Sequence, residues 1–373
     1  GFNILQEEKE LQFLGIAKMT DTLCKTTKQA IAQTKQLGIA TKILTGDSYE
    51  AASYVGEEIG LIDNDKQIYI GSDLENMDAE SFHEAIIKGR VFARVTPIMK
   101  YKILETLKKE YVVGFMGDGI NDTPAMNLAD ISIAVNNATD IAKESADIVL
   151  MEDNLLNIIH GIQYGRSIFV NINKYIKHAM IGNLGNFFSL SLFYVAFAMD
   201  LPMLPIQLLL ANLIQDMPLM TIYSDSVDPI DLATPKQNTE LRKVLKSAVY
   251  LGIFTMIYYL LYFFYMGTDA NEVTRTNLFL FFNITQLLVI ISIRNKQFLW
   301  QGKKPAPLLL GTIAFFVIFS IAIPYTPVVS TMLGFTPLPL LTLGKVGIIA
   351  IVYILLLDVC KIAIGKWERR KEV

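Results

Sequence analysis

The stretch YVVGFMGDGINDTPA, residues 111–125, decides the fold of the first half of this chain. Tyr111–Phe115 is apolar and predicts a strand, which runs directly into a glycine-rich acidic turn. Two carboxylates on that turn, Asp118 and Asp122, flank Asn121. Such hard oxygen ligands suit Mg²⁺, which takes few carboxylates and completes its shell with phosphate oxygens and water. A plain strand-to-helix turn capped by an aspartate is the structural alternative.

Short apolar segments alternate with amphipathic helical ones on both sides of this turn. The other predicted strands are Leu11–Ala17, Ala40–Leu44, Ile68–Ile70, Val91–Ala93, Ile131–Val135 and Ile148–Leu150. The predicted helices are Thr27–Leu37, Ser48–Ile59 and Pro97–Lys109, and Gly38 and Gly60 follow the first two as stop signals. The alternation predicts an α/β doubly wound parallel sheet in residues 1–160, with its ligand beyond the carboxyl ends of the strands.

A second polar turn, TGD at residues 45–47, lies between a predicted strand and a predicted helix. Its hydroxyl and its backbone N–H groups at a helix start would form an anion site. Lys100, in FARVTPIMK, is a cation that could neutralise phosphoryl charge. Gly117 and Gly119 would let the backbone approach a phosphate without a Cβ clash. A capping turn and a solvated lysine are the structural alternatives.

From about residue 168 onward, long apolar runs dominate a chain in which 52% of the residues are hydrophobic. Six runs approach the roughly 20 residues that a helix needs to span a bilayer. They cover residues 168–198, 202–223, 245–266, 274–293, 306–324 and 342–364. We therefore predict an all-α bundle of six transmembrane helices within residues 161–373, in which the first helix begins as a cytoplasmic stalk. Buried core helices of a soluble protein are the alternative.

We expect charged residues to lie between these runs rather than inside them. Lysine and arginine are concentrated in every second connection. The basic residues after the second run, after the fourth run and in the C-terminal tail are Lys236, Arg242, Lys243, Lys246, Arg294, Lys296, Lys303, Lys304, Lys366, Arg369, Arg370 and Lys371. The opposite connections hold only Arg275. The positive-inside rule therefore places the soluble half and the C-terminus on the cytoplasmic side.

The overall charge and the cysteines exclude some classes of function. The net charge of −3 provides no basic field for a nucleic-acid partner. The two cysteines, Cys24 and Cys360, are far apart and indicate neither a disulfide framework nor a zinc site.

Polar side chains inside the apolar runs are costly, and they therefore indicate function. The first run contains Asn183 and Asn186 in GNLGNFFS. The second contains Asn212, Gln215 and Asp216 in ANLIQDMP, at positions i, i+3 and i+4 that share one helix face. We expect these five residues to bind a transported ion, with polar contacts between helices as the alternative.

The composition of this predicted ion site favours a hydrated cation. Pro218 follows Asp216 by two residues and should break the helix, freeing backbone carbonyls as ligands. Ca²⁺ takes six to eight oxygens, usually with several carboxylates, whereas Mg²⁺ keeps much of its water. An amide-rich site with one carboxylate therefore suits an ion that stays partly hydrated.

The turn sequences occur in a recognisable order. TGD, FARVTPIMK, GDGINDTPA and ATDIAKESADIVL resemble, in that order, the phosphorylation domain of P-type cation-transporting ATPases. That domain is haloacid-dehalogenase-like, and FLGIAKMTD is similar to the strand that leads back into it. The resemblance implies that ATP is the substrate and that Mg²⁺ is the catalytic cofactor, bound by Asp118 with support from Asn121 and Asp122. It also implies that Thr45 and Gly46 of the TGD turn, which includes the catalytic candidate Asp47, hold the phosphoryl group and that Lys100 neutralises it.

The chain departs from the family pattern in ways that matter for activity. It contains no DKTG, the motif that carries the phosphorylated aspartate, and the nucleotide-binding domain, the actuator domain and the first four membrane helices have no counterpart. It begins Gly-Phe-Asn, without a Met, so we expect a fragment or one product of a split gene. We expect that the chain alone cannot hydrolyse ATP, that its partner is the missing N-terminal half, and that its incomplete sheet lacks a central strand.

The membrane half carries its own resemblance. NLGN and NLIQD stand where P-type ATPases hold ion ligands in their fifth and sixth membrane helices, and calcium pumps typically show a glutamate where Asn186 stands. NINKYIK, MLPIQLL and IPYTPVVSTMLGFTPLPL look like the bacterial magnesium-transporting branch. The resemblance implies a multi-pass protein of the bacterial plasma membrane that imports Mg²⁺.

Three other functions remain open from the sequence. The chain could belong to a pump for Ca²⁺ or another cation, or it could be a truncated, non-catalytic partner that regulates a complete pump. It could also be a soluble phosphatase domain on an unrelated membrane anchor. That last reading needs a strand that ends in a nucleophilic DxD or DKT-like motif, and none of the predicted strands does.

Overall fold

The structure is a computed structural model, and it describes residues 23–24, 26–63, 67–152, 154–197, 201–233, 239–266 and 271–370. The chain divides into two compact units, residues 1–160 and 161–373, and the division falls within one helix, α9 (Leu156–Gly182). Each unit is described by itself below. The predicted strand Leu11–Ala17 lies outside the described residues.

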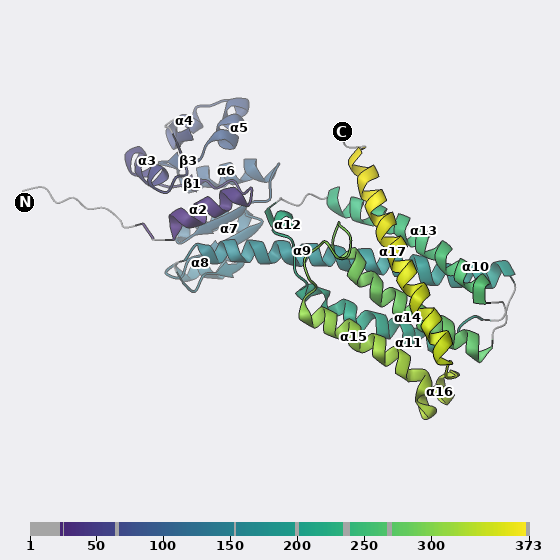
Figure 1. The fold of residues 1–373 in the computed structure, drawn as a ribbon. Helices are drawn as coiled ribbons and strands as arrows, with labels where there is room; N and C mark the ends of the chain where they lie inside the picture. Colours follow the sequence, from purple (N-terminus) through teal and green to yellow (C-terminus); the bar gives the residue numbers. More distant parts are fainter. Residues whose placement is uncertain are drawn as a thin grey trace, which may run out of the picture. The chain divides into compact units, whose positions relative to one another are not determined.

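The first unit alternates short strands with helices (Figure 1). The strands are β1 (Ile43–Leu44), β2 (Ile68–Ile70), β3 (Val91–Ala93), β4 (Gly114–Gly117), β5 (Ile131–Ala134) and β6 (Ile148–Val149). The helices are α2 (Thr27–Gln36), α3 (Tyr49–Glu58), α4 (Gly71–Glu75), α5 (Ala79–Lys88), α6 (Pro97–Lys108), α7 (Thr123–Leu128) and α8 (Asp140–Glu144), with a 3₁₀ turn η3 (Ile120–Asp122).

Local sequence signals account for these helix ends. Thr96 accepts a hydrogen bond from the backbone N–H of Met99 and Pro97 occupies the first turn, so α6 begins where the chain supplies a cap and a preset φ. Gly38 and Gly60 adopt φ of 67° and 72° beyond α2 and α3, a conformation that favours glycine. The predicted helices around these signals are confirmed within one residue at each end.

All strand pairs are parallel, as predicted, but among the described residues the strands form two sheets rather than one. The strand orders are β1-β3-β2 and β4-β5-β6, each with three strands. Leu44 in β1 and Val113, just before β4, pack against the hydrophobic clusters of both sheets. The two sheets therefore share a core, although no described strand joins β1 to β4 by hydrogen bonds.

The second unit is helical (Figure 1). Its helices are α9, α10 (Phe188–Phe197), α11 (Pro205–Met220), α12 (Pro229–Ala233), α13 (Thr239–Met266), α14 (Glu272–Ile293), α15 (Pro307–Ala322), α16 (Pro327–Leu333) and α17 (Leu340–Arg370). A π-helical turn η4 (Asn183–Phe187) joins α9 to α10, and the 3₁₀ turns η5 (Thr221–Ser224) and η6 (Ile323–Tyr325) follow α11 and α15.

Four of the described helices are long and apolar enough to cross a membrane: Leu241–Met266, Glu272–Ile293, Pro307–Tyr325 and Leu340–Glu368. They correspond to the last four of the six predicted spans. The first predicted span is occupied by α9, η4 and α10, and the second by α11, which is only 16 residues long. Of the four candidates, α14 is by far the most buried, so the bundle packs around it.

The helix irregularity is not where the sequence predicted it. Pro218 does not break α11, because it lies in the last turn and the helix continues through it to Met220. The irregularity falls instead on NLGNF in η4, where the backbone turns are widened. Turns of this kind are frequent at functional sites in helices, because they change which side chains share a face.

The expectation that charges lie only between the apolar runs is wrong. Within α17, Asp358 and Lys361 form a buried ion pair, and Asp358 also accepts hydrogen bonds from Ser292 Oγ at 2.8 Å and from the backbone N–H of Leu299 at 2.8 Å. The Lys361 ammonium additionally donates to the Ser292 carbonyl at 2.7 Å. The charges can be buried here because each is paired within α17 and the remaining hydrogen bonds come from Ser292 and Leu299 outside that helix.

Candidate functional site

The TGD turn lies at the carboxyl end of β1, where a parallel sheet holds its ligand. The Thr45 hydroxyl donates to Asp47 Oδ2 at 2.7 Å and accepts from the backbone N–H of Asp47 at 3.1 Å, so the turn is closed on itself. Ser48, rather than Asp47, caps the following helix α3. A Cβ added to Gly46 would meet no atom within 4 Å, so the backbone of this exposed turn is open to an approaching ligand.

Backbone hydrogen bonds tie this turn to the end of β3. The Arg94 N–H donates to the Asp47 carbonyl at 2.9 Å, and the Val95 N–H donates to the Thr45 carbonyl at 3.0 Å. Arg94 adopts φ of 51°, the one positive value for a non-glycine residue in the described part of the chain. Its carbonyl lies so close to Gly71 that a Cβ there would be 2.4 Å away. The backbone around the turn is therefore held in a strained conformation, which often marks a functional loop.

The acidic turn after β4 separates its two carboxylates into different environments. Asp122 is 7% exposed and accepts from Lys100 Nζ at 2.7 Å, while its other oxygen lies 3.4 Å from the backbone N–H of Asp118. A Cβ on Gly117 would lie 2.6 Å from the Cβ of Asp122. The packing of Asp122 thus requires a glycine at residue 117, and the expected approach of a phosphate to this turn stays a prediction.

Asp118 and Asn121 are exposed, and the acid Asp118 makes no ion pair within the described residues. No group of three or more His, Cys, Asp or Glu side chains converges in the described part of the chain. The turn therefore offers one exposed carboxylate, that of Asp118, beside the amide of Asn121 and an Asp122 already paired with Lys100. This donor set fits a Mg²⁺ ion that is bound mainly by water and phosphate oxygens. Asp118 would be the ligand, with Asp122 behind it.

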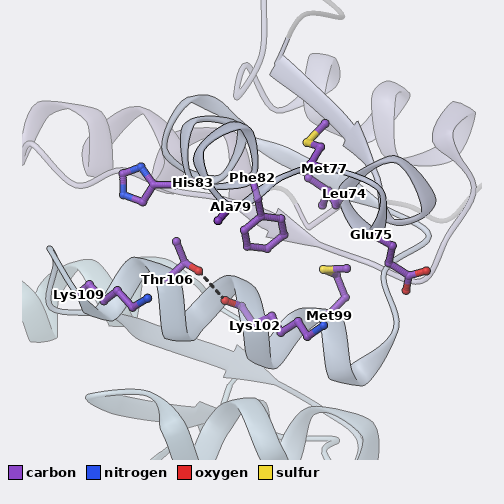
Figure 2. A pocket seen from close by; sticks show the side chains of 10 residues that line it. All are labelled: Leu74, Glu75, Met77, Ala79, Phe82, His83, Met99, Lys102, Thr106 and Lys109. Atoms are coloured by element: carbon purple, nitrogen blue, oxygen red, sulfur yellow. Dashed lines mark hydrogen bonds between the residues drawn. The ribbon is translucent and has the colours of Figure 1, made fainter.

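A cavity of about 450 Å³ in the same unit contains none of these residues. Figure 2 shows it between α5 and α6, with Phe82 and Met99 on its apolar side and Lys102 and Lys109 along α6. His83 at its edge is 2.8 Å from the carboxylate of Glu110. The residues predicted to handle phosphate therefore gather at the strand ends and not in this cavity.

In the helical unit, amide side chains from three elements meet in the interior. Asn186 of η4 donates to Gln215 Oε1 of α11 at 3.3 Å, and Gln215 in turn donates to Asn283 Oδ1 of α14 at 3.5 Å. Gln286 of α14 donates to Asn186 Oδ1 at 3.5 Å and to the Tyr259 hydroxyl at 3.0 Å. We call Asn186, Gln215, Asn283 and Gln286 the amide cluster.

The amide cluster retains an unused oxygen. Gln286 is fully buried, and its Oε1 has no hydrogen-bond partner. It faces the backbone of α9, since a Cβ on Gly182 would lie 3.2 Å from it. A buried carbonyl oxygen without a partner costs free energy in the free protein and is available to a cation.

The other three predicted ion ligands lie outside this interior. Asn183, Asn212 and Asp216 are exposed on the surface of the described chain, although Gln215 next to Asp216 is buried. Asn212, Gln215 and Asp216 are neighbours at i, i+3 and i+4 on the helix. Only Gln215 lies inside the packed interior, and the other two lie just outside it. The sequence prediction missed Asn283 and Gln286. Their spacing of three residues within the otherwise apolar FFNITQLL would have indicated that both lie on one helix face.

A buried acid, Asp225, links the segment after α11 to two other helices. Asp225, after η5, accepts from Lys174 Nζ of α9 at 2.7 Å and from Arg294 Nη2 at the end of α14 at 2.8 Å. Burial would raise the pKa of Asp225, but the hydrogen bonds from Arg294 and Lys174 lower it below its ordinary value. Two ion pairs of one carboxylate therefore tie α9, the segment after α11 and the end of α14 together.

Comparisons with known proteins cover both units. A family model described as "Cation transporting ATPase, C-terminus" matches residues 200–363, and a model for haloacid dehalogenase-like hydrolases matches residues 3–130. The Magnesium-transporting ATPase, P-type 1, of Escherichia coli strain K12 is 36% identical over 333 residues, which is 87% of this chain and 36% of that protein. A protein with the same name from Salmonella typhimurium strain LT2 is 34% identical over 90% of this chain and 37% of its own length.

Calcium-transporting proteins are similar as well. The Calcium-transporting ATPase of Bacillus subtilis strain 168 is 28% identical over 334 residues, which is 86% of this chain and 37% of that protein. The chain thus spans a little over a third of the length of the curated relatives that it matches.

Proposed function

This chain belongs to the P-type cation-transporting ATPases, where it corresponds to their C-terminal part, and on that premise we propose that it is the rear part of an ATP-driven divalent-cation pump. The first unit handles the phosphoryl group and the second holds part of the ion site. The observation that carries the proposal is the amide cluster, because its four buried amides converge in an apolar bundle and leave the Gln286 carbonyl oxygen without a partner and available to a cation.

In the first unit we assign the chemistry to the two turns. The Thr45 hydroxyl and the open backbone at Gly46 would hold the phosphoryl oxygens, and the Lys100 ammonium would neutralise their charge. Asp122 keeps Lys100 in place through the 2.7 Å contact. Asp118 would bind Mg²⁺, which supplies positive charge next to the phosphate when it is bound.

The nucleophile has to come from elsewhere, since the sequence contains no DKTG. The split between the two sheets supports this view. β1 carries the TGD turn at its end, β4 carries the acidic turn, and neither has a described partner on its remaining side. A strand placed between them would bring an aspartate at its carboxyl end between the two turns, and we propose that the missing N-terminal half supplies it.

In the second unit we propose that the transported cation is Mg²⁺. The cluster supplies amide oxygens and Asp216 supplies one carboxylate, so the ion would keep part of its water. The exposed Asn183, Asn212 and Asp216 would be unfavourable against lipid, and we propose that the membrane helices missing from this chain cover them. A Ca²⁺ pump is the second candidate, because calcium-transporting relatives match over most of the same residues.

The proposed topology follows the basic connections. The chain would lie in the bacterial plasma membrane as a multi-pass protein, with the first unit and the C-terminus in the cytoplasm. All six predicted spans would cross, including α11 and the segment interrupted by η4.

Cation uptake into proteoliposomes by the complete polypeptide tests this proposal. We expect ATP-driven Mg²⁺ uptake that Asp216→Asn and Gln286→Leu each reduce by about tenfold or more, in line with a lost buried ligand. Ser320→Ala is the matched control, since Ser320 is buried in α15 and bonds only to its own helix at Phe316. Uptake that survives both ligand substitutions would remove the cluster from the transport path, and uptake of Ca²⁺ instead of Mg²⁺ would select the second candidate.

A further inference from the structure

A cationic cavity lies at one end of the helical unit, away from the amide cluster. Its volume is about 220 Å³, and it is formed where α13 ends and where α14 and α17 begin. Lys345 stands in its lining, only five residues beyond the first residue of α17. A lysine within an apolar membrane helix is costly unless it meets water, a headgroup or a partner, and it therefore calls for an explanation.

The lining of this cavity offers donors and one positive charge. Besides Lys345 its lining includes Tyr265 and Thr342, whose side chains carry hydroxyls, and the amide residue Asn277, which is 1% exposed. The Asn277 carbonyl oxygen already accepts a hydrogen bond from the Tyr262 hydroxyl, so its NH₂ group remains as a donor. None of the described residues that line the cavity is acidic, and no ion pair of Lys345 occurs within the described residues. The chemistry is that of an anion site.

The other part of the lining is apolar. Tyr262, Met266, Val346 and Ile349 contribute the remaining surface. The three aliphatic residues among them favour an amphiphilic anion over a fully polar one. The cavity lies at the end of the bundle opposite the basic connections, where the helices leave the bilayer core. A phosphate oxygen of a lipid headgroup would meet Lys345 and the hydroxyls at this depth, and an acyl chain would lie along the apolar residues.

We propose that this cavity binds the headgroup phosphate of an anionic phospholipid in the leaflet at that end of the helices. The Lys345 ammonium is the principal contact, and the Thr342 and Tyr265 hydroxyls and the Asn277 amide donate to the remaining oxygens. The site is independent of the ion pathway, since it shares no residue with the amide cluster or with Asp216. It would anchor α13 to α17 through a bound lipid.

Photocrosslinking to the full chain in mild detergent tests the site. A photoreactive phosphatidylglycerol should label peptides that contain residues 262–266 and 342–349. Lys345→Met should reduce this labelling by about fivefold, the effect of one headgroup cation, while Lys345→Arg retains it. Lys303→Met, at the other end of the bundle, is the matched control and should leave it unchanged.

The competing outcomes are distinct. Equal labelling by a photoreactive phosphatidylcholine with the same acyl chain would show that the cavity does not select an anionic lipid. Unchanged labelling of Lys345→Met would show that the Lys345 ammonium is solvated by water and does not contact the lipid phosphate. Either result overturns the proposal. Loss of labelling in excess inorganic phosphate, but not in excess unlabelled phosphatidylglycerol, would also overturn it in favour of a free phosphate. If Lys345→Met fails to fold, as judged by its melting curve, Thr342→Val takes its place and should still reduce labelling.

Discussion

At the scale of single residues, the environment of each acid decides its role more than its place in the sequence does. The sequence predicted that Asp118, Asn121, Asp122 and Lys100 belong to one site. It could not show that the Asp122 carboxylate is buried against Lys100 while that of Asp118 is exposed. This difference in exposure depends on the backbone path of η3 and on the absence of a Cβ at Gly117. The assignment of Asp118 to Mg²⁺ therefore rests on the structure's geometry as well as on the motif.

Lys42 provides a residue-scale prediction outside the proposed site. Its ammonium donates to the carbonyls of Ile86 at 2.8 Å and Ile87 at 3.0 Å, at the end of α5. Burial, assisted by the charge of Arg90, lowers the pKa of Lys42 to about 8. In the unfolded chain this lysine keeps its ordinary, higher pKa, so between the two values the unfolded state binds more protons and the free energy of unfolding rises with pH.

We therefore expect the acetylation rate of Lys42 in the intact chain to reach half its maximum near pH 8. The same residue in the urea-unfolded chain should do so about two pH units higher, close to the ordinary lysine value. Peptide mass spectrometry after brief labelling at a series of pH values measures Lys42 in both states. Identical profiles for the folded and the unfolded chain would mean that burial does not lower the pKa of Lys42.

At the scale of elements, the helices α2, α3 and α6 were predicted within a residue and the three-residue strands β2 and β3 with their observed bounds, whereas α5 and the π-helical turn were not predicted. The strand predicted at Tyr111–Phe115 is observed three residues later, as β4, because pairing with β5 begins only at Gly114, and Tyr111 and Val112 are exposed. The π-helical turn on NLGNF has no sequence signal of its own. It becomes understandable only from its packing against α13.

Two glycines make that packing possible. A Cβ on Gly185 would lie 2.4 Å from Thr255 Cγ2, and a Cβ on Gly252 would lie 2.7 Å from Leu184 Cβ. Thr255 cannot easily move aside, since its hydroxyl is bonded to the Leu251 carbonyl and to the Tyr353 hydroxyl. Small residues thus let η4 and α13 approach closely, as is common between membrane helices.

We predict that Gly185→Ala destabilises the helical unit by about 1–3 kcal/mol, the usual cost of overpacking a core. Gly347→Ala is the matched control on α17, because a Cβ there meets no atom within 4 Å. Thermal melting of the detergent-solubilised chain, followed by size-exclusion chromatography after heating, compares the two variants. A wild-type melting temperature for Gly185→Ala would show that η4 does not pack against α13 in this way.

At the scale of the whole molecule, the family and the two kinds of architecture could be predicted from the order of the motifs and from the length of the apolar runs. Two features needed the structure. The amide cluster uses α14, whose asparagine and glutamine were hidden in a run that reads as an apolar span. The two separate sheets show an interruption of the fold that the sequence only implied through a missing motif.

The central claim is that this chain holds the phosphate-handling side chains and part of the ion site of a pump, but not its nucleophile. The most direct measurement is acid-stable incorporation of γ-phosphate from ATP, with the chain alone and after addition of a separately expressed N-terminal part that carries DKTG. We predict no phosphoenzyme and no steady ATP hydrolysis from the chain alone, and phosphorylation of the N-terminal part once the two are combined. Sustained ATP turnover by the 373-residue chain alone would contradict the account.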